Sequence, residues 1–310
     1  MKTLFVSSAD ANYFAMLLEW VQSIRRFPES REMEIGIMDA GLLPEQVLRL
    51  QNMGCKVVAP EWPCPIPPSK IRGRNFLKSC VCRPFIPEYF PGYDMYFWMD
   101  ADTWVQRWDV VGMFLEGARR GKMALTAQVD RAYPRPIRIK WLGPFPWKVR
   151  GFYYSNARKA YGCKMARELL NYYVLSAGAF ALRADAPHWK AWQNRIKTTL
   201  QRGGNIFTAE QLSLGIICHL EGLPVESLPA WTHWLCQFKP LWDEQAHAFV
   251  EPNMPHEKIG ILHLSGWDKM RVDRSLTTDF KTLEGQTVEL SYRYPHFDGE
   301  AAEEPVSVVA

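Results

Sequence analysis

The sequence predicts an α/β fold in which a mostly parallel central sheet is flanked by helices. Over residues 1–100, short apolar runs typical of buried strands alternate with segments of helical spacing. The apolar run Tyr93–Met99 then ends at two carboxylates, Asp100 and Asp102, which are separated by the small residue Ala101. Buried strands carry polar groups only at their ends, and open α/β sheets bind ligands at the carboxyl ends of their strands. The Asp pair therefore predicts the edge of the sheet at which a site lies.

The first half of the chain is expected to alternate strands and helices. The expected strands are Thr3–Ser7, Glu34–Met38, Lys56–Val58 and Tyr93–Met99. Helices are expected from about Asn12 to Phe27, from Pro44 to just before Gly54, and from near Arg74 to Cys82. Residues 61–70 hold four prolines and are expected to form a loop. Strands that are separated by helices favour a parallel sheet with right-handed crossovers.

The second half adds further strands and helices. The expected strands are Met123–Gln128, Tyr173–Leu182 and a run from Lys258 to His263, and the expected helices are Ala186–Leu200 and one that begins near Thr208. The strand after residue 172 contains the small residues Ser176-Ala177-Gly178, and a glycine inside a strand often marks the close approach of a ligand or another backbone. Thr208 is the expected N-cap of its helix. Glu210 and Gln211 then fall in the first turn, where an acid also complements the helix dipole.

Composition is that of an ordinary globular protein. The sequence is 47% hydrophobic and 23% charged, and its 310 residues are enough to bury the core of one large domain, or of one domain with an excursion. No apolar run approaches the roughly 18 residues that cross a bilayer, and the N-terminal apolar run is too short for a signal peptide. The seven cysteines follow no disulfide framework or zinc spacing. A cytoplasmic protein with reduced thiols and no transmembrane segment is therefore expected.

A basic and aromatic insertion at 130–172 interrupts the α/β pattern. From Arg131 to Arg167 there are ten Lys or Arg, eight aromatic residues and no Asp or Glu. Because the whole chain has a formal net charge of +4, the remainder carries −6, so the basic character is local. The segment suits an anionic acceptor or an acidic membrane surface, to which the protein would bind peripherally. An exposed loop with scattered charges is the alternative, and nucleic acid is not expected because no recognised binding module accompanies the segment.

Two groups of residues are candidates for ligand binding at the sheet edge. Asp100 and Asp102 suit a hard divalent cation that carries phosphates, and a turn with two solvated acids is the alternative. The loop Asp10–Tyr13 follows the first strand and opens a helix, where a nucleotide could sit, although it lacks both a dinucleotide-binding fingerprint and a P-loop. A simple N-cap at Asp10 or Asn12, with Tyr13 packed, explains this loop equally well.

Basic residues and one histidine could complete such a site. Lys78 shares a helix face with Arg74 and could reach a diphosphate or a sugar, or simply be solvated. The last predicted strand ends at His263, whose imidazole could join two carboxylates around a metal. Gly266 would let the backbone approach phosphate, and Lys269 would neutralise a leaving diphosphate.

Five motifs in this sequence resemble those of a known family. They are Asp10-x-Asn12-Tyr13, Asp100-x-Asp102, Ser176-Ala177-Gly178, Glu210-Gln211 and His263-x-x-Gly266-x-x-Lys269. They occur in the order seen in retaining glycosyltransferases of the GT-A fold, and the sequence resembles the glycogenin and bacterial lipopolysaccharide galactosyltransferase family over roughly 1–130 and 170–270. The resemblance implies a GT-A type, Rossmann-like sheet in one catalytic domain at 1–270. Residues 271–310 would form a C-terminal extension that ends in a disordered tail.

The resemblance also implies the chemistry. It points to a hexosyltransferase that takes a nucleotide-sugar donor, usually a UDP-sugar, with Mn²⁺ or Mg²⁺ bridging the phosphates, and an acceptor glycan, glycolipid or protein. Asp100, Asp102 and His263 would bind the metal. The donor would be held by Asp10, Asn12, Tyr13, Lys78, Asp100, Ala101, Ser176, Ala177, Gly178, Gly266 and Lys269. Gln211 and Glu210 would be catalytic, stabilising an oxocarbenium-like sugar that the acceptor attacks with retention.

Three departures from the family pattern concern the donor sugar and its surroundings. Ser176 stands where the family usually has Asn, Glu210 stands where it has Asp, and Met270-Arg271 replaces Pro-Trp. The first two put the identity of the transferred sugar in doubt. A nucleotidyltransferase on a similar sheet, and a non-catalytic protein that binds nucleotide sugars or anionic glycans, are the alternative functions.

Overall fold

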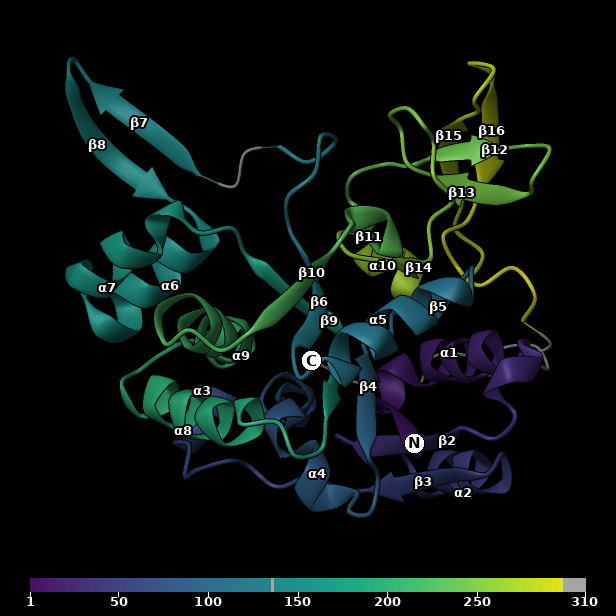
Figure 1. Ribbon diagram of the computed structural model, residues 1–310, viewed down its shortest axis with the longest axis horizontal. Helices are drawn as coiled ribbons and strands as arrows, with labels where there is room; N and C mark the ends of the chain where they lie inside the picture. Colours follow the sequence, from purple (N-terminus) through teal and green to yellow (C-terminus); the bar gives the residue numbers. More distant parts are fainter. Residues whose placement is uncertain (135–136, 298–310) are drawn as a thin grey trace.

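The computed structural model describes residues 1–134 and 137–297, and its centre is a seven-stranded sheet with the strand order β10-β6-β9-β4-β1-β2-β3 (Figure 1). The strands are β1 (Thr3–Ala9), β2 (Glu34–Asp39), β3 (Cys55–Val58), β4 (Met95–Met99), β6 (Met123–Ala127), β9 (Leu175–Arg183) and β10 (Val225–Leu228). Only β9 runs antiparallel to its two neighbours in this sheet. The mostly parallel α/β sheet predicted from the sequence is therefore confirmed.

Helices cover both faces of the central sheet because its strands are apolar on both sides. In β1, Phe5 packs beneath α1 (Phe14–Arg25) and α5 (Asp109–Arg119). Leu4 and Val6 point to the opposite face, which α4 (Ile86–Tyr89) and α8 (His188–Gln201) cover. Each fully buried side chain of this size contributes about 1.5–3 kcal/mol to folding. The core thus fixes the strand ends at which the site is built.

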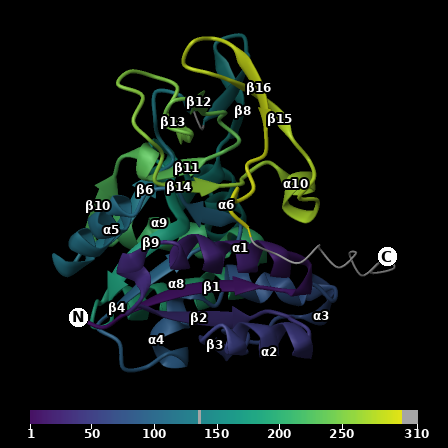
Figure 2. The ribbon, with the colours of Figure 1, turned by 90° about the vertical axis from the view of Figure 1, so that its right-hand side faces the viewer.

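A second, smaller layer lies above the carboxyl edge of the central sheet (Figure 2). It consists of β11 (His233–Leu235), β14 (Ile261–His263) and β5 (Thr103–Val105). Beside it lie the hairpins β12 (Leu241–Asp243) with β13 (Ala248–Val250) and β15 (Thr278–Lys281) with β16 (Thr287–Leu290). Because β5 begins just after Asp102 and β14 ends at His263, the pairing of these two strands brings the predicted metal ligands together.

The segment after residue 270 packs against the rest of the fold. Phe280, Tyr292 and Tyr294 share a buried cluster with Trp104 of β5. The carboxylate of Glu19 in α1, which is 2% exposed, accepts hydrogen bonds from Arg274 and Arg293. The predicted boundary at residue 270 stays a prediction, and the predicted disordered tail lies outside the described residues.

The basic insertion has two parts. The first is the hairpin β7 (Arg138–Leu142) and β8 (Phe145–Arg150), which projects away from the body (Figure 1). The second is the helix pair α6 (Phe152–Tyr161) and α7 (Cys163–Glu168), whose apolar side packs on α9 (Ile206–Gly215). The Tyr153 hydroxyl accepts a hydrogen bond from the Leu175 amide at 3.0 Å. The helices α6 and α7 thus anchor the insertion to the body, and the hairpin β7–β8 before them is exposed.

The remaining elements refine the predictions. The other helices are α2 (Pro44–Asn52), α3 (Pro68–Ile71) and α10 (Asp268–Val272). The expected helix from Arg74 to Cys82 is a 3₁₀ helix over Asn75–Cys80, confined between Gly73 at φ 71° and Pro84. The N-cap of α9 is Asn205, not Thr208, because the Asn205 side chain accepts from the Phe207 amide. Among the described residues, no helix is long and apolar enough to cross a membrane.

Candidate functional site

A cleft of about 510 Å³ opens at the carboxyl edge of the parallel strands. Loops after β1 and β4, the start of the antiparallel β9, the first half of α9 and the end of β14 line it. Twelve of the predicted site residues lie on its walls: Asp10, Asn12, Tyr13, Asp100, Ala101, Asp102, Ser176, Ala177, Gly178, Glu210, Gln211 and His263. Lys78, Gly266 and Lys269 are not among the lining residues, and Lys269 is exposed on α10. The roles of all these residues stay predictions.

Asp100, Asp102 and His263 form a compact cluster in this cleft. One ligand atom from each residue lies within 4.8 Å of the other two. Nε2 of His263 is 3.4 Å from Oδ1 of Asp102 and 3.9 Å from Oδ2 of Asp100. Two carboxylate oxygens and one imidazole nitrogen thus face a common point, which is the donor set that Mn²⁺ or Mg²⁺ would accept.

Arg83 holds the outer side of Asp100. Its Nη2 is 2.7 Å from Oδ1 of Asp100, and its Nη1 is 2.8 Å from Oε2 of Glu210. The guanidinium also lies over the ring of Trp98, whose Nε1 donates to Oδ1 of Asp100 at 2.9 Å. Burial opposes the charge on Arg83, but Asp100 and Glu210 outweigh this effect and raise its pKa. Since Oδ1 of Asp100 is occupied in this way, Oδ2 is left facing the cluster.

Arg271 holds the outer side of Asp102 in the same manner. Its Nη2 is 2.7 Å from Oδ2 of Asp102, and its Nε donates to the Leu264 carbonyl at 3.0 Å. Burial opposes ionisation of Asp102, but His263 and Arg271 outweigh it and hold the pKa of this carboxyl below its usual range. Asp102 is therefore an anion whose second oxygen is directed at His263.

His233 and Thr126 orient the ring of His263. Nε2 of His233 is 3.1 Å from Nδ1 of His263, and Nδ1 of His233 is 3.2 Å from the Thr126 hydroxyl. Burial lowers the pKa of His233 well below its usual value, so this imidazole is neutral and can accept a hydrogen bond at one ring nitrogen while it donates one from the other. When Nδ1–H of His263 donates to His233, the lone pair on Nε2 is free for a metal.

Gly178 makes room for this histidine pair. A Cβ atom at position 178 would lie 2.8 Å from Cε1 and 2.9 Å from Nδ1 of His263. The small residue in β9 was expected to permit close approach, and what approaches is the stacked pair of His263 and His233. The Gly178 carbonyl also accepts from the Asp100 amide at 2.8 Å, which ties β9 to the Asp pair.

Glu210 and Gln211 present polar atoms to the cleft from the first half of α9. Oε1 of Glu210 is buried and has no hydrogen-bond partner within the described part of the chain, while Oε2 pairs with Arg83. Burial raises the pKa of Glu210 to about 8, against the attraction of Arg83. The Gln211 amide nitrogen donates to the Leu175 carbonyl at 2.8 Å, so its carbonyl oxygen is directed away from that bond. Both residues can meet a polar ligand group.

The loop after β1 forms one end of the cleft. Asp10 is the N-cap of the 3₁₀ helix Ala11–Tyr13 and accepts from the Tyr13 amide at 3.2 Å. Asn12 donates to the same carboxylate at 3.2 Å. Asp10 therefore has the geometry of the simple N-cap that the sequence offered as an alternative to nucleotide binding. Capping leaves the half-buried ring of Tyr13 on the cleft wall, where a base could stack.

The residues present fit a divalent cation. Each carboxylate has one oxygen held by an arginine and one directed at Nε2 of His263, while the second ring nitrogen of His263 is held by His233. This arrangement presents two oxygens and one nitrogen and leaves further coordination positions toward the cleft. Such an incomplete protein ligand set is typical of sites at which phosphate oxygens complete the coordination of the metal.

Sequence reasoning missed Arg83 and His233 and recorded Arg271 only as a departure from the family pattern. Arg83 does carry a signal, because it is a single charge in the apolar stretch 80–86 and buried charges are almost always paired. His233 carries none, since its partners Thr126 and His263 are distant in the sequence.

Comparisons with known proteins bear on the fold. No protein-family model and no curated protein matches the sequence. The chain is similar to the apo structure of WbbM, a bifunctional glycosyltransferase, with a TM-score of 0.51 and 15% identity over 86% of this chain and 46% of that one. It thus spans about half of that protein.

Two structures of LgtC match over 85% of this chain and 87% of theirs. One is an active-site mutant, with a TM-score of 0.49 and 13% identity. The other is the galactosyltransferase in complex with donor and acceptor sugar analogs, with a TM-score of 0.46 and 14% identity. At these identities the comparisons reach the fold alone, and the WbbM likeness carries that conclusion: this chain has the predicted GT-A type α/β fold.

Proposed function

We propose that this protein is a metal-dependent glycosyltransferase that takes a nucleotide-sugar donor, a UDP-sugar by family resemblance. The observation that supports it most is the cluster of Asp100, Asp102 and His263 inside a cleft that also holds the Asp10–Tyr13 loop and Glu210. A nucleotide sugar requires a site for a cation that binds phosphate, a ring on which the base can stack and polar groups for the sugar, and the residues that could supply all three line one cleft.

In this proposal Asp100, Asp102 and His263 would hold Mn²⁺ or Mg²⁺, which would supply Lewis-acid stabilisation of the diphosphate leaving group. Arg271 is the cation that lines the cleft beside Asp102, whereas Lys269 is exposed outside it. We therefore assign to Arg271 the neutralisation of phosphate charge that the family resemblance gives to Lys269. A planar guanidinium suits phosphate because it donates two parallel hydrogen bonds.

The sugar lies between the metal cluster and α9. The free Oε1 of Glu210 accepts a hydrogen bond from a sugar hydroxyl, and the Gln211 carbonyl oxygen stabilises positive charge at the anomeric carbon. An acceptor hydroxyl then attacks from the side of the leaving group and its proton passes to the departing diphosphate, which gives retention.

The test is a screen of nucleotide sugars with the purified full chain and Mn²⁺, with and without chelator, that measures release of nucleoside diphosphate. Slow hydrolysis of the donor needs no acceptor, so the screen works before the acceptor is known. Chelator-sensitive release of nucleoside diphosphate from one donor class is the expected result. Release of pyrophosphate would instead indicate a nucleotidyltransferase, and donor binding without any release would indicate a non-catalytic binding protein.

A further inference from the structure

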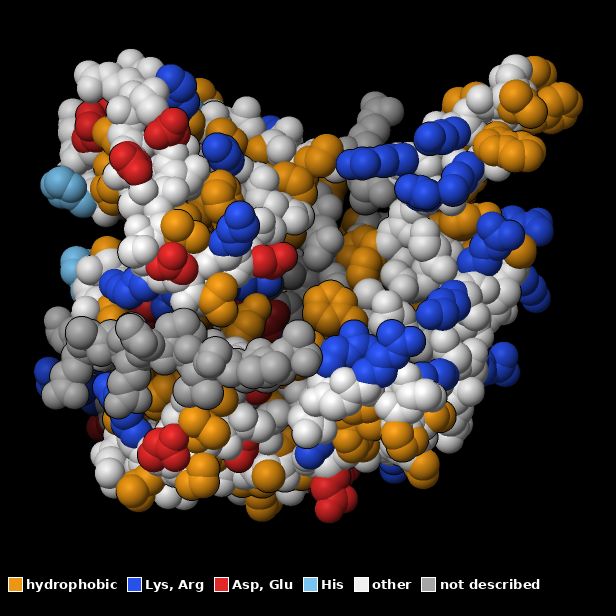
Figure 3. Space-filling model, turned by 180° about the vertical axis from the view of Figure 1, so that it is seen from behind, with side chains coloured by type: hydrophobic (Ala, Val, Ile, Leu, Met, Phe, Trp, Pro, Cys, Tyr) orange, Lys and Arg blue, Asp and Glu red, His pale blue; other side chains and the backbone are white. Residues whose placement is uncertain are grey.

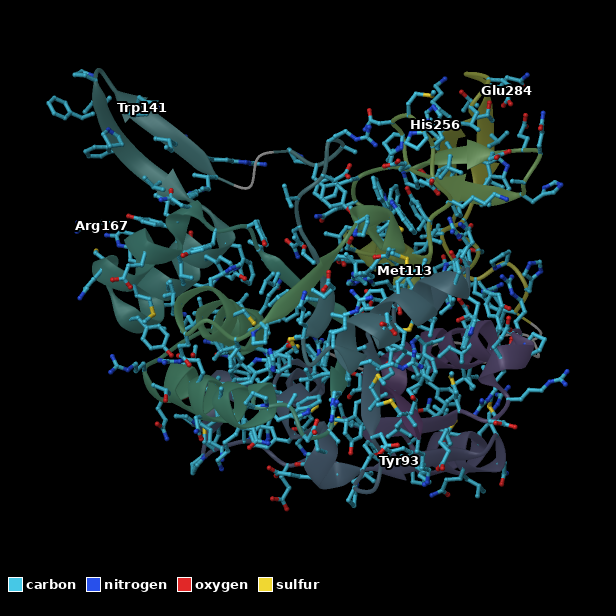
Figure 4. The ribbon with its side chains drawn as sticks, viewed as in Figure 1. Tyr93, Met113, Trp141, Arg167, His256 and Glu284 are labelled. Carbon is cyan, nitrogen blue, oxygen red and sulfur yellow. The ribbon has the colours of Figure 1, made fainter. Side chains whose placement is uncertain are left out.

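The hairpin β7–β8 has an apolar end that nothing in the described structure covers. All five residues of β7 are exposed, and five of the six in β8 are exposed as well. The exposed fraction is 61% for Trp141, 71% for Phe145 and 72% for Trp147. Trp141 lies near the far end of the hairpin, away from the body (Figure 4). Large apolar side chains gathered at one exposed end indicate a binding surface.

The strands of the hairpin place like charges opposite one another. Arg138 pairs with Arg150 in register, and Lys140 pairs with Lys148. Residues directly opposite in an antiparallel pair share a face, and like charges at such positions destabilise the pair. Within residues 1–134 and 137–297, none of these four side chains forms a salt bridge. An isolated two-stranded hairpin is only marginally stable in water. Because an anionic partner would relieve the repulsion between the facing basic side chains, this face of the hairpin is suited to one.

The basic character continues onto the base of the insertion. Arg158 and Lys159 of α6 and Lys164 and Arg167 of α7 are exposed. The space-filling view shows hydrophobic side chains at the far end of the hairpin and Lys and Arg side chains between that end and the body (Figure 3). The order along the projection is therefore apolar end, basic strands, basic helices.

We infer that the β7–β8 hairpin docks this protein onto an anionic lipid bilayer by inserting Trp141, Phe145 and Trp147 between the headgroups while its Lys and Arg side chains contact lipid phosphates. Trp favours the membrane interface, and basic residues near an acidic leaflet are attracted to its surface potential. A narrow projection such as this hairpin can insert into a bilayer without a complementary binding pocket. A protein partner would need an apolar pocket ringed by acids in register with the hairpin.

The experiment is flotation of the purified full chain with vesicles of phosphatidylcholine alone and with vesicles that contain 30% phosphatidylglycerol. Binding only to the anionic vesicles, reduced in 0.5 M NaCl, is expected, because salt screens the attraction of basic residues to the surface. The triple variant Trp141→Ser, Phe145→Ser, Trp147→Ser should weaken partitioning by about tenfold or more. The pair Lys140→Gln, Lys148→Gln should weaken it by about 10- to 30-fold at low salt.

Matched controls use exposed residues outside the insertion. Leu48→Ser with Val272→Ser removes exposed apolar side chains, and Arg31→Gln with Lys190→Gln removes two exposed charges. Both controls should partition like the wild type. Wild-type partitioning of the triple variant would overturn the inference, as would equal binding to neutral and anionic vesicles.

A self-association surface is the rival outcome. Sedimentation of the chain without lipid, as a dimer that the triple variant converts to monomer, would identify a second copy as the partner and overturn lipid docking. Donor hydrolysis, measured in the absence of vesicles, should be unchanged in every hairpin variant. If the proposed sugar transfer fails, the vesicle experiment still tests lipid docking. If lipid docking fails, donor hydrolysis still tests the proposed sugar transfer.

Discussion

The cleft and the β7–β8 hairpin arrange charge in opposite ways. In the cleft, Arg83 contacts both Asp100 and Glu210, and Arg271 pairs with Asp102, so each buried arginine lies against acidic side chains of the same chain. On the hairpin, Arg138 faces Arg150 and Lys140 faces Lys148 in solvent. The buried arginines of the cleft find acidic partners within the chain, whereas the basic side chains of the hairpin have only one another and the solvent. Substitutions in the cleft should therefore affect chemistry and stability, and substitutions on the hairpin should affect only partner binding.

Removing a predicted metal ligand should have the largest effect. Asp102→Ala should lower metal-dependent release of nucleoside diphosphate by about a thousandfold or more, because the cation loses an anionic ligand. Turnover at saturating Mn²⁺ measures the effect, and calorimetric titration with Mn²⁺ separates binding from chemistry. Asp268→Ala is the matched control, since Asp268 also pairs with Arg271 but is largely exposed. Undiminished turnover of Asp102→Ala would contradict the assignment.

Removing Arg83 should lower turnover less than Asp102→Ala does, but it should also lower the free energy of unfolding. Arg83→Met leaves the buried Asp100 and Glu210 carboxylates without their shared cation and should destabilise the protein by about 3 kcal/mol. Urea unfolding measures the loss. Arg119→Met, which removes an arginine from a surface pair with Glu116, should leave the midpoint unchanged. Equal midpoints for the two variants would show that the buried bridge contributes nothing.

Uncoupling His263 from its neighbour should have an intermediate effect. His233→Phe keeps a ring of similar shape but removes the hydrogen bond to Nδ1 of His263, so Mn²⁺ affinity should fall about 10- to 100-fold. Titration with Mn²⁺ measures it, and the stability of the variant is followed in parallel. His219→Phe, a histidine stacked on Tyr172 away from the cluster, is the control. An unchanged Mn²⁺ affinity with a lowered melting temperature would reduce His233 to a packing role.

The strands and motifs that could be predicted from the sequence are those whose signal lies in a short run of neighbouring residues. The strand Met95–Met99 is apolar on both faces, so its carboxyl end and the Asp pair after it follow from burial, whereas its start was predicted two residues too early, at Tyr93. The order of motifs then placed twelve candidate residues that the structure brings to one cleft. Capping is less determined, because both Asn205 and Thr208 can accept an amide, and the side chain of Asn205 makes the observed bond.

Long-range partners were not predictable from the sequence. Arg83 pairs with Glu210 from a different helix, and His233 contacts His263 only because β11 and β14 run side by side in the small sheet. Neither pairing has a fixed spacing in the sequence. The composition of the insertion did indicate a basic, aromatic segment, but not that Tyr153 would anchor its helices while the hairpin before them stays exposed.

The smallest expected effect concerns the stability of the hairpin variants. Trp141→Ser, Phe145→Ser, Trp147→Ser removes three large side chains that pack on nothing in the body, so the free energy of unfolding should change by less than about 0.5 kcal/mol per substitution. Phe114→Ala, which removes one fully buried ring beneath the sheet, should by contrast cost about 3–5 kcal/mol. Urea unfolding of both proteins makes the comparison. A large loss in the hairpin variant would mean that its aromatic side chains contribute to the core, and the contrast between a hairpin exposed for a partner and a cleft built into the core would then be wrong.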